Sequence, residues 1–258
     1  MGEGGSRVPH PGCVPSVAAV PPAAPRRHIV PPPAGPTALV CCATTKGPLS
    51  VAVRPRWAPR GATRFVDMVR SGHFDDGVPM MRCLANFLCQ FGLSANASRN
   101  RWRPFPDDPP WLPHGPDYRA DAFGNQRFKT GYVAYAGAGK DSRAQQLIVG
   151  NHDDCCLAGG QPWETPFGEL VGAASFDTLA RIYTGYGESG PSQGHLRAEG
   201  WTRDDPGRFP LLDHISSCAV VDDATTVSDW RPYPGNYRHA TFRGRASVAA
   251  YVVEGAPP

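Results

Sequence analysis

The sequence predicts a mainly β fold, a closed antiparallel barrel with two helices that plug its ends. Gly and Pro number 29 each in 258 residues, so more than a fifth of the chain favours turns. Short apolar stretches recur between these turns, and helical periodicity occurs at only two places, far apart in the sequence. A hydrophobic content of 41% and a charged content of 19% fit a globular core with uncharged loops.

The N-terminal part of the chain, residues 1–45, is predicted to be a disordered, Pro-rich arm. Ten prolines fall within residues 1–40, and such a segment buries too little apolar surface to offset the entropy lost on ordering. The arm could be a polyproline-type ligand for a partner or a plain linker. Its opening, MGEGGS, matches the N-myristoylation pattern through Gly2 and Ser6, although so short a pattern is common by chance.

A barrel domain is predicted over residues 46–222. Apolar and small or polar residues alternate over residues 49–53, which indicates a first strand. Apolar residues at helical spacing predict a helix over residues 62–69, which Gly72 ends, and another over residues 176–183, which Gly185 ends. Further strands are predicted at residues 87–93, 131–136, 146–149, 167–171 and 215–221.

Two polar segments lie outside this pattern. Residues 97–126 combine prolines, aromatic residues and acids, and a loop of this length is unusual unless it binds something or is mobile. Residues 223–258 form a C-terminal extension that could add an edge strand or simply trail. No internal repeat is visible.

Composition argues against two classes of partner. The net charge is only +3, so nucleic acid is not expected, and Arg99, Arg101 and Arg103 around Trp102 are interpreted as a loop face. No apolar run approaches the roughly 20 residues that a membrane-spanning helix needs. Prolines interrupt the N-terminal stretch VPSVAAVPPAAP, so no secretory signal is expected either.

The eight cysteines do not form a recognisable metal or disulfide pattern. Cys83 and Cys89 lie in an apolar, strand-like stretch of the sequence and are interpreted as buried thiols. This favours an intracellular reducing compartment, cytoplasm or organelle. The run from His152 to Cys156 is interpreted as a solvated loop, because adjacent residues rarely close a tetrahedral site. GAGKDS lacks the spacing of a phosphate loop. Neither a metal nor a cofactor is expected.

One short pattern carries a family resemblance. Arg82, Phe87 and Gln90 follow one another in RCLANFLCQ, at the spacing that resembles the proline site of cyclophilin-type peptidyl-prolyl isomerases. In one extended strand Arg82 and Phe87 would face opposite sides, so we expect a bend or bulge between them. Fragments in the family's order surround this pattern: GPLSVAV, RFVDMVRSGHFDD, GYVAYAGAGKDSRAQQLIV, PFGELVGAASFDTLARIYTGYGE and RFPLLDHISSCAVV.

The resemblance implies an eight-stranded antiparallel barrel with two capping helices and a substrate groove on the outer wall. It implies that Arg82 is the catalytic donor, although a surface arginine in a salt bridge is the alternative. The implied proline pocket consists of Phe87, Leu88, Ile148 and Leu157, each of which could equally be ordinary core. The implied peptide grip consists of Gln90, Gln146, Ala136 and Gly137.

Several residues depart from the family pattern. Ile148 stands where an aromatic residue is usual, and Gly137 where Asn is usual. Cys156 replaces a tryptophan that mainly affects cyclosporin, so weak cyclosporin binding is expected. Glu164 falls where the family has a groove histidine, and it could pair with Arg82 and compete with substrate, whereas the neighbouring Trp163 could restore an aromatic wall.

The sequence therefore favours an isomerase that acts on X-Pro bonds of proline-containing polypeptides and aids folding or conformational switching. The chain is expected to be a monomer. Two alternatives stay open: a catalytically weak module that binds proline peptides, and a scaffold whose contacts come from the arm and from residues 97–126.

Overall fold

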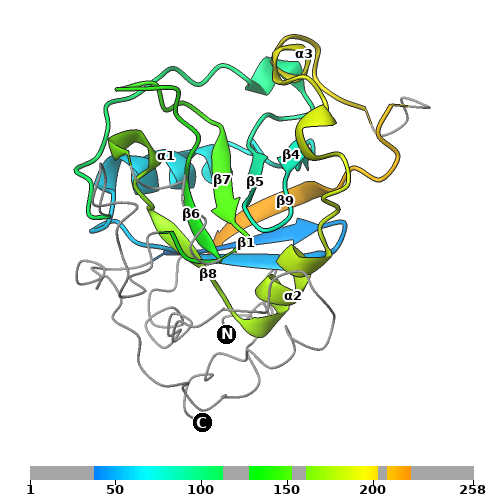
Figure 1. Cartoon of the computed structure of the whole chain (residues 1–258). Helices are drawn as coiled ribbons and strands as arrows, with labels where there is room; N and C mark the ends of the chain where they lie inside the picture. The colour runs from blue at the N-terminus through cyan, green and yellow to red at the C-terminus, as the bar shows by residue number, and fades with distance from the viewer. Residues whose placement is uncertain (1–37, 113–127, 153–160, 203–207, 222–258) are drawn as a thin grey trace, which may run out of the picture.

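The computed structural model of the protein describes residues 38–112, 128–152, 161–202 and 208–221. These residues form one curled antiparallel sheet of nine strands with helices around it (Figure 1). The strands are β1 (Ala38–Thr44), β2 (Gly47–Val53), β3 (Val78–Pro79), β4 (Arg82–Cys83), β5 (Leu88–Phe91), β6 (Tyr132–Tyr135), β7 (Leu147–Gly150), β8 (Gly168–Val171) and β9 (His214–Val221). The helices are α1 (Pro59–Arg70), α2 (Ala173–Arg181) and α3 (Gln193–Glu199), with 3₁₀ turns η1 (Ala97–Arg99), η3 (Pro162–Glu164) and η4 (Gly187–Ser189).

The two edges of the sheet belong to one stretch of chain. The hydrogen-bonded order is β3-β9-β1-β2-β8-β6-β7-β5-β4, so β3 and β4 are the edges. Only Met80 and Met81 separate these strands in the sequence, and the chain therefore crosses from one edge of the sheet to the other. The prediction of a mainly β antiparallel barrel is confirmed. The count is nine strands rather than eight, and among the described residues no hydrogen-bonded pairing joins β3 to β4, so the sheet is a curled half-barrel and not the fully closed barrel that was predicted.

Side chains fill the inside of the curled sheet. Phe65 of α1 packs against Phe74 and Phe167, with ring centroids 5.9 and 5.1 Å apart. The cavity that remains inside is about 20 Å³, close to the volume that one water molecule needs. The interior is thus a packed core, and a substrate site has to lie on the outer wall.

Helix α1 begins without a capping side chain from the residue before it. Pro59 suits the first helical turn, but Ala58 before it has no side chain that could accept a hydrogen bond. Asp108 supplies the missing acceptor from a distant loop, because its carboxylate accepts the backbone N–H groups of Arg60 and Gly61, both at 2.9 Å. This cap is itself paired with the buried Arg143, whose Nη1 lies 3.0 Å away.

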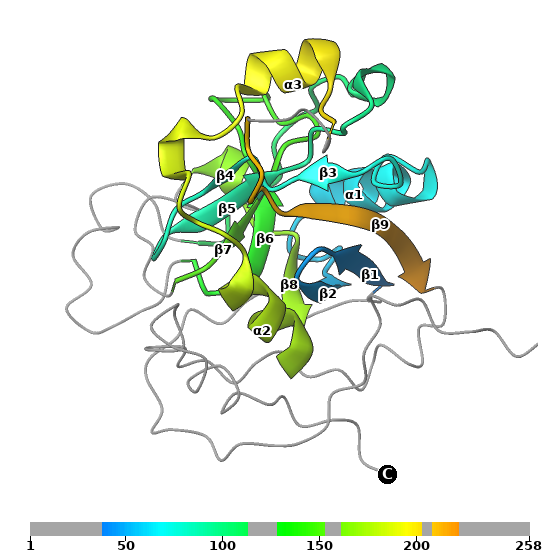
Figure 2. The same cartoon turned by 90° about the vertical axis from the view of Figure 1, so that its right-hand side faces the viewer.

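The other helices lie at opposite ends of the sheet, α2 below and α3 above (Figures 1 and 2). Helix α2 packs on β2 and β8, as expected for the predicted second helix, although it begins earlier than residue 176. Helix α3 was not expected. Its one fully buried residue, Leu196, contacts Met81, Leu93 and Trp201, so the signal in the sequence is too weak to reveal it. No described helix has the length and apolarity to cross a bilayer.

The ordered region begins earlier than predicted. The sequence analysis assigned residues 1–45 to a disordered arm, yet β1 starts at Ala38 and pairs with both β2 and β9. Burial of both faces explains the error: Val40 and Cys42 belong to the interior core and Leu39 and Cys41 to a second cluster, so the strand reads as a continuous apolar run without alternation. The rest of the arm and the whole of the C-terminal extension lie outside the described residues.

A buried histidine, His73, holds the chain at the end of strand β5. His73 is 1% exposed, and its Nε2 lies 2.9 Å from the carbonyl oxygen of Gly92, just after β5. Its Nδ1 lies 3.2 Å from Nε1 of Trp102, which can only donate. His73 is therefore neutral, with its proton on Nε2, and burial lowers its pKa.

We expect the free energy of unfolding to fall as the pH drops below 6.5, the ordinary pKa of histidine, because the unfolded chain takes up a proton that folded His73 resists. Urea denaturation of wild type and of His73→Gln between pH 8 and pH 5 measures this. The variant should lose most of the pH slope. His195→Gln, which removes a half-exposed histidine, should keep it, and an equal slope in all three proteins would contradict the assignment.

Candidate functional site

A short hairpin carries three of the residues that the sequence singled out. Arg82 of β4 is the register partner of Gln90 of β5, and the turn between the strands is closed by the N–H of Leu84, which donates to the carbonyl of Leu88 at 2.9 Å. Asn86 has a φ of 60°, which lets the chain reverse there. The expected bend or bulge between Arg82 and Phe87 is thus a complete hairpin turn, and it brings Arg82 beside Gln90.

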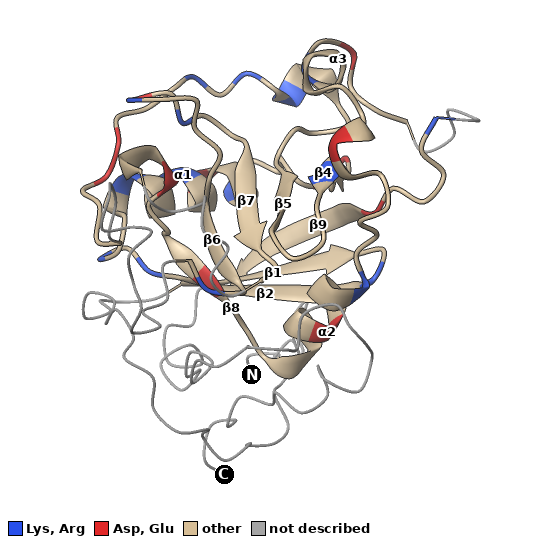
Figure 3. Cartoon of the chain, viewed as in Figure 1, with Lys and Arg blue, Asp and Glu red and all other residues tan. Residues whose placement is uncertain are grey.

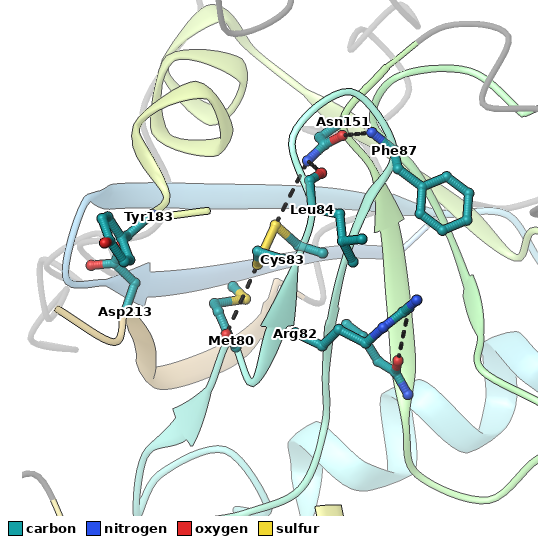
Figure 4. Close-up of a disulfide and its surroundings, with 10 residues drawn as sticks. Met80, Arg82, Cys83, Leu84, Phe87, Asn151, Tyr183 and Asp213 are labelled. Carbon is teal, nitrogen blue, oxygen red and sulfur yellow. Dashed lines mark hydrogen bonds between the residues drawn. A yellow bond between two sulfur atoms is a disulfide. The ribbon is translucent and has the colours of Figure 1, made fainter. Parts of the chain in front are cut away.

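Asn151, which the sequence analysis missed, locks this turn. Its Oδ1 accepts the N–H of Phe87 at 2.7 Å, and its Nδ2 donates to the carbonyl of Leu84 at 2.8 Å (Figure 4). Its own N–H donates to the carbonyl of Phe87 at 3.2 Å. The side chain is fully buried, so these bonds have no competition from water. Phe87 is therefore held in place from β7, and an Asn directly after an apolar strand was the only available signal.

A disulfide crosses the same hairpin. Cys83 and Cys89 are register partners and are joined through their sulfur atoms (Figure 4). Both are buried, as predicted, but the prediction that they are thiols is wrong, because the antiparallel register sets them directly opposite each other. A second disulfide joins Cys42 of β1 to Cys218 of β9, which are also register partners. The argument for a reducing compartment from free thiols loses its basis at these positions.

The predicted site residues share one face of the sheet. Along each strand, alternate side chains point to opposite faces. On β5 and β7, Cys89, Phe91, Leu147 and Val149 belong to the interior core, whereas Leu88 and Ile148 belong to a separate outer cluster. Gln90 and Gln146 have the same parity as Leu88 and Ile148, so the outer face carries both the apolar cluster and the polar groups.

The polar groups form a chain of hydrogen bonds. Nη1 of Arg82 lies 3.4 Å from Oε1 of Gln90, the contact drawn beside Arg82 in Figure 4. Nε2 of Gln90 donates to Oε1 of Gln146 at 2.7 Å. The guanidinium also lies 6.0 Å from the ring centroid of Phe87, within reach of a cation–π contact. Arg82, Phe87, Gln90 and Gln146 are thus brought together, as the sequence predicted.

The edge of the Arg82 guanidinium that faces away from Gln90 is paired with the carboxylate of Glu188. Nε and Nη2 donate to the two carboxylate oxygens of Glu188, at 2.7 and 2.6 Å. Figure 3 shows the acidic turn η4 directly beside basic β4. The hydrogen bond from Arg82 is the main reason that the pKa of Glu188 lies below its ordinary value. Among the described residues the carboxylate on Arg82 is therefore Glu188 and not Glu164, which the sequence analysis had considered.

The apolar cluster on the outer face is larger than predicted. Leu88 and Ile148 pack there with Phe87 and Ala136, whereas Leu157 lies outside the described residues. The additional members are Trp57, Trp111, Leu112, Phe128, Tyr132 and Ala134. Trp111 and Leu112 come from the segment 97–126, whose role the sequence left open. Trp111 also donates from Nε1 to the carbonyl of Pro166 at 3.3 Å, so this part of the segment is fastened to the sheet.

Trp163 covers the end of β6. A Cβ added to Gly137 would lie 2.6 Å from Cδ1 of Trp163, which no real pair of carbons tolerates. Gly137 therefore leaves the space that the indole of Trp163 occupies. The N–H of Ala136 donates to the carbonyl of Gln146 at 2.9 Å, so this donor is used within the sheet. Glu164, the last residue of η3, follows Trp163 and is half-exposed.

Comparison with known proteins places the chain in a family. The model of the family described as "Cyclophilin type peptidyl-prolyl cis-trans isomerase/CLD" matches residues 39–197. No curated protein sequence matches the chain significantly.

Solved structures of similar fold are also found. A cyclophilin from Hirschia baltica is 16% identical with a TM-score of 0.50, and the match covers 74% of this chain and 76% of that one. A cyclophilin-type isomerase from Cryptosporidium parvum is 14% identical with a TM-score of 0.44, over 72% of this chain and 99% of that one. The same protein crystallised in the presence of the dipeptide Ala-Pro gives a TM-score of 0.43, with the same identity and coverage.

The disulfide across the hairpin leads to a first prediction for this site. Replacing both Cys83 and Cys89 by Ala should lower the free energy of unfolding by about 2 kcal/mol, because the link closes a short loop in the unfolded chain. Urea denaturation without reductant measures the loss. Amide NMR shifts of residues 82–91 should change in this variant and stay as in wild type when Cys42 and Cys218 are replaced instead. Alkylation of both Cys83 and Cys89 in the unreduced protein, detected by mass spectrometry, would refute the pairing.

Packing between Gly137 and Trp163 gives a second prediction. Gly137→Ala should cost about 1–3 kcal/mol of unfolding free energy, because the new methyl group overlaps the indole. In a Trp163→Ala background the same change should cost less than about 0.5 kcal/mol, since the space is then free. Denaturation of the four proteins gives the coupling energy. Equal costs in both backgrounds would show that Trp163 does not lie on Gly137.

Proposed function

The chain belongs to the cyclophilin-type peptidyl-prolyl cis-trans isomerase family, and from this we propose that it accelerates cis–trans exchange at X-Pro bonds of proline-containing polypeptides, aiding folding or conformational switching. The observation that carries the proposal is the position of Arg82. Its guanidinium lies on the outer face, between the ring of Phe87 and the amide of Gln90. Members of the family are generally isomerases of this kind.

The chemistry needs little more than a well-placed donor. Resonance gives the X-Pro bond partial double-bond character, with a barrier of about 18–20 kcal/mol. Rotation breaks no covalent bond, but it localises a lone pair on the proline nitrogen. A guanidinium is permanently charged and planar, so it can donate to that nitrogen without gaining or losing a proton. Arg82 is the residue to which we assign this role.

The apolar cluster is suited to the proline ring. We assign the ring to Phe87, Leu88 and Ile148, which lie within one packed cluster, with Leu157 as a further wall. Trp111 extends this apolar surface from a loop, in a protein that has Ile148 where the family has an aromatic residue. A rigid apolar surface next to a fixed donor orients the X-Pro bond, which is where much of the rate gain in such a reaction arises.

The polar chain is suited to the peptide backbone. We assign this contact to Gln90 and Gln146, which are linked side by side at 2.7 Å, and to the main chain at Ala136 and Gly137. Because the Ala136 N–H is engaged by Gln146, the available main-chain contacts begin at the Ala136 carbonyl. Glu164 would lie at the margin of this contact. Monomeric state, weak cyclosporin binding and the division at residue 222 remain predictions.

A second candidate function is binding of proline peptides with little turnover. It is favoured by Trp163, which lies on Gly137 at the end of β6 and would restrict how a peptide pairs there. Under this alternative the apolar cluster still accepts proline, and Arg82 contributes only to affinity.

Turnover of wild type and of Arg82→Ala separates the two functions. Exchange NMR on an Ala-Pro tetrapeptide should show catalysed exchange in wild type and a loss of about 100-fold or more in Arg82→Ala, because one preorganised donor contributes that much to many transition states. Arg82→Lys should also lose most of the activity, since an ammonium keeps the charge but not the planar fork.

The control for this experiment is Arg99→Ala, which removes another arginine that is ion-paired, here with Asp76, away from the site. It should leave exchange within twofold of wild type. Wild-type exchange no faster than that of the free peptide, with peptide shifts that still show binding, would replace the enzyme by the binding module. Absence of binding would reject both.

A further inference from the structure

Arg82 and Glu188 are 106 residues apart in the sequence, and a dedicated turn brings them together. Glu188 lies in η4, within the stretch that runs from the end of α2 to α3, and in Figure 1 this stretch passes beside β4. Contact between η4 and β4 is extensive for such short elements. Glu188 thus belongs to a turn that packs against β4, the edge strand that carries Arg82.

The turn is anchored on both sides of Glu188. Before it, the N–H of Gly187 donates to the carbonyl of Thr184 at 3.1 Å, and after it the N–H of Ser189 donates to the carbonyl of Tyr186 at 2.8 Å. Gly190 then lies so close to β4 that a Cβ there would be 2.2 Å from the carbonyl oxygen of Met81. Any larger residue at position 190 would push η4 away from the hairpin.

Helix α3 holds the far end of this stretch. Ser192 caps the helix by accepting the N–H of His195, and Leu196 is buried against Met81, the residue just before Arg82. The chain that follows Glu188 is therefore held next to β4 at two places, Gly190 and Leu196. A carboxylate on such a support differs from a mobile surface acid, although its side chain is 64% exposed.

The contact divides the guanidinium into two edges. Nε and Nη2 point to the two oxygens of Glu188, in the parallel two-bond geometry that suits a carboxylate. Nη1 is left on the other edge and points to Gln90. One edge thus faces the anchored turn, and the other faces the outer cluster where we place the X-Pro peptide.

We propose that Glu188 is a positioning residue for Arg82. It holds the Nε and Nη2 edge so that Nη1 is directed at Gln90 and at the bound X-Pro bond. The proposal rests on the proposed function, because it takes Arg82 as the donor to the proline nitrogen. Free arginine side chains sample many rotamers, and a two-bond clamp removes most of them before substrate arrives. Glu188 is ionised at neutral pH, where it can make both bonds.

Glu188→Gln tests the proposal, because the amide keeps the size of the side chain but can accept only one of the two bonds. We expect kcat for Ala-Pro exchange to fall about tenfold, with KM within twofold of wild type, because the donor is misplaced while the proline pocket is intact. Glu188→Asp, which keeps both oxygens, should recover part of the loss.

An independent signal reports on the clamp itself. The Arg82 Nε–Hε NMR cross-peak, assigned through its absence in Arg82→Ala, should be sharp and displaced in wild type and should move to the position of a solvent-exposed arginine in Glu188→Gln. The matched control is Glu199→Gln, which removes the same charge from an equally exposed glutamate that pairs with His195. It should change neither kcat nor the cross-peak.

Each other outcome has a definite meaning. A cross-peak and a kcat that are both unchanged in Glu188→Gln overturn the positioning role while the isomerase function stands. A rise in kcat would also overturn it, since Glu188 would then restrain Arg82 from the substrate. An equal loss in Glu199→Gln would reduce the effect to overall charge. A wild type without turnover overturns the proposed function, and the role of Glu188 in catalysis with it, even where the cross-peak reports the pair.

Discussion

A buried ion pair between Arg143 and Asp108 ties the parts of this molecule together. Both side chains are completely buried, and Nη1 of Arg143 lies 3.0 Å from Oδ2 of Asp108. Asp108 caps helix α1, whereas Arg143 stands just before β7 and stacks on Phe105, 4.4 Å from its ring centroid. Loss of Arg143 would leave the buried carboxylate of Asp108 without its ion partner, which typically costs 3–5 kcal/mol. Helix α1, the loop that contains Asp108 and the segment that leads into β7 are therefore joined at one point.

The segments joined by this ion pair lead to the candidate site, and the alternation of side chains along the strands decides which of them face outward there. Arg143 lies a few residues before β7, in which Ile148 faces outward, as does Gln146 just before the strand, while Leu147 and Val149 face the core. The loop that contains Asp108 continues to Trp111, which packs on the same outer cluster. Because the barrel interior is packed, binding surface can arise only outside, where two elements lie beside the hairpin of Arg82. These are the η4 turn on one side and the strand β7 on the other.

The candidate site combines an arginine positioned by its hairpin with aromatic rings that come from outside the strands. Trp111 packs from a loop on the outer cluster that includes Ile148, and Trp163 of η3 lies against Gly137, just after β6. Each of these rings is held by its own contacts. Trp111 donates to the carbonyl of Pro166, and Trp163 occupies the space that the missing side chain of Gly137 leaves. Strand residues, in contrast, are oriented by the sheet itself. The positions of these rings therefore depend on contacts made by the segments that carry them, while Arg82 and Gln90 are positioned by their register.

The sequence by itself determined whatever rests on local periodicity and short spacing. Strands such as residues 167–171, helix α1 and the triplet of Arg82, Phe87 and Gln90 are of this kind, because alternation, helical repeats and a hairpin involve residues a few positions apart. Only the tertiary structure decided which distant groups meet these elements. Glu188 reaches Arg82 over 106 residues, and Cys42 joins Cys218 over 176. Such contacts depend on how the sheet curls and on where its edges come to lie, which no short window of sequence specifies.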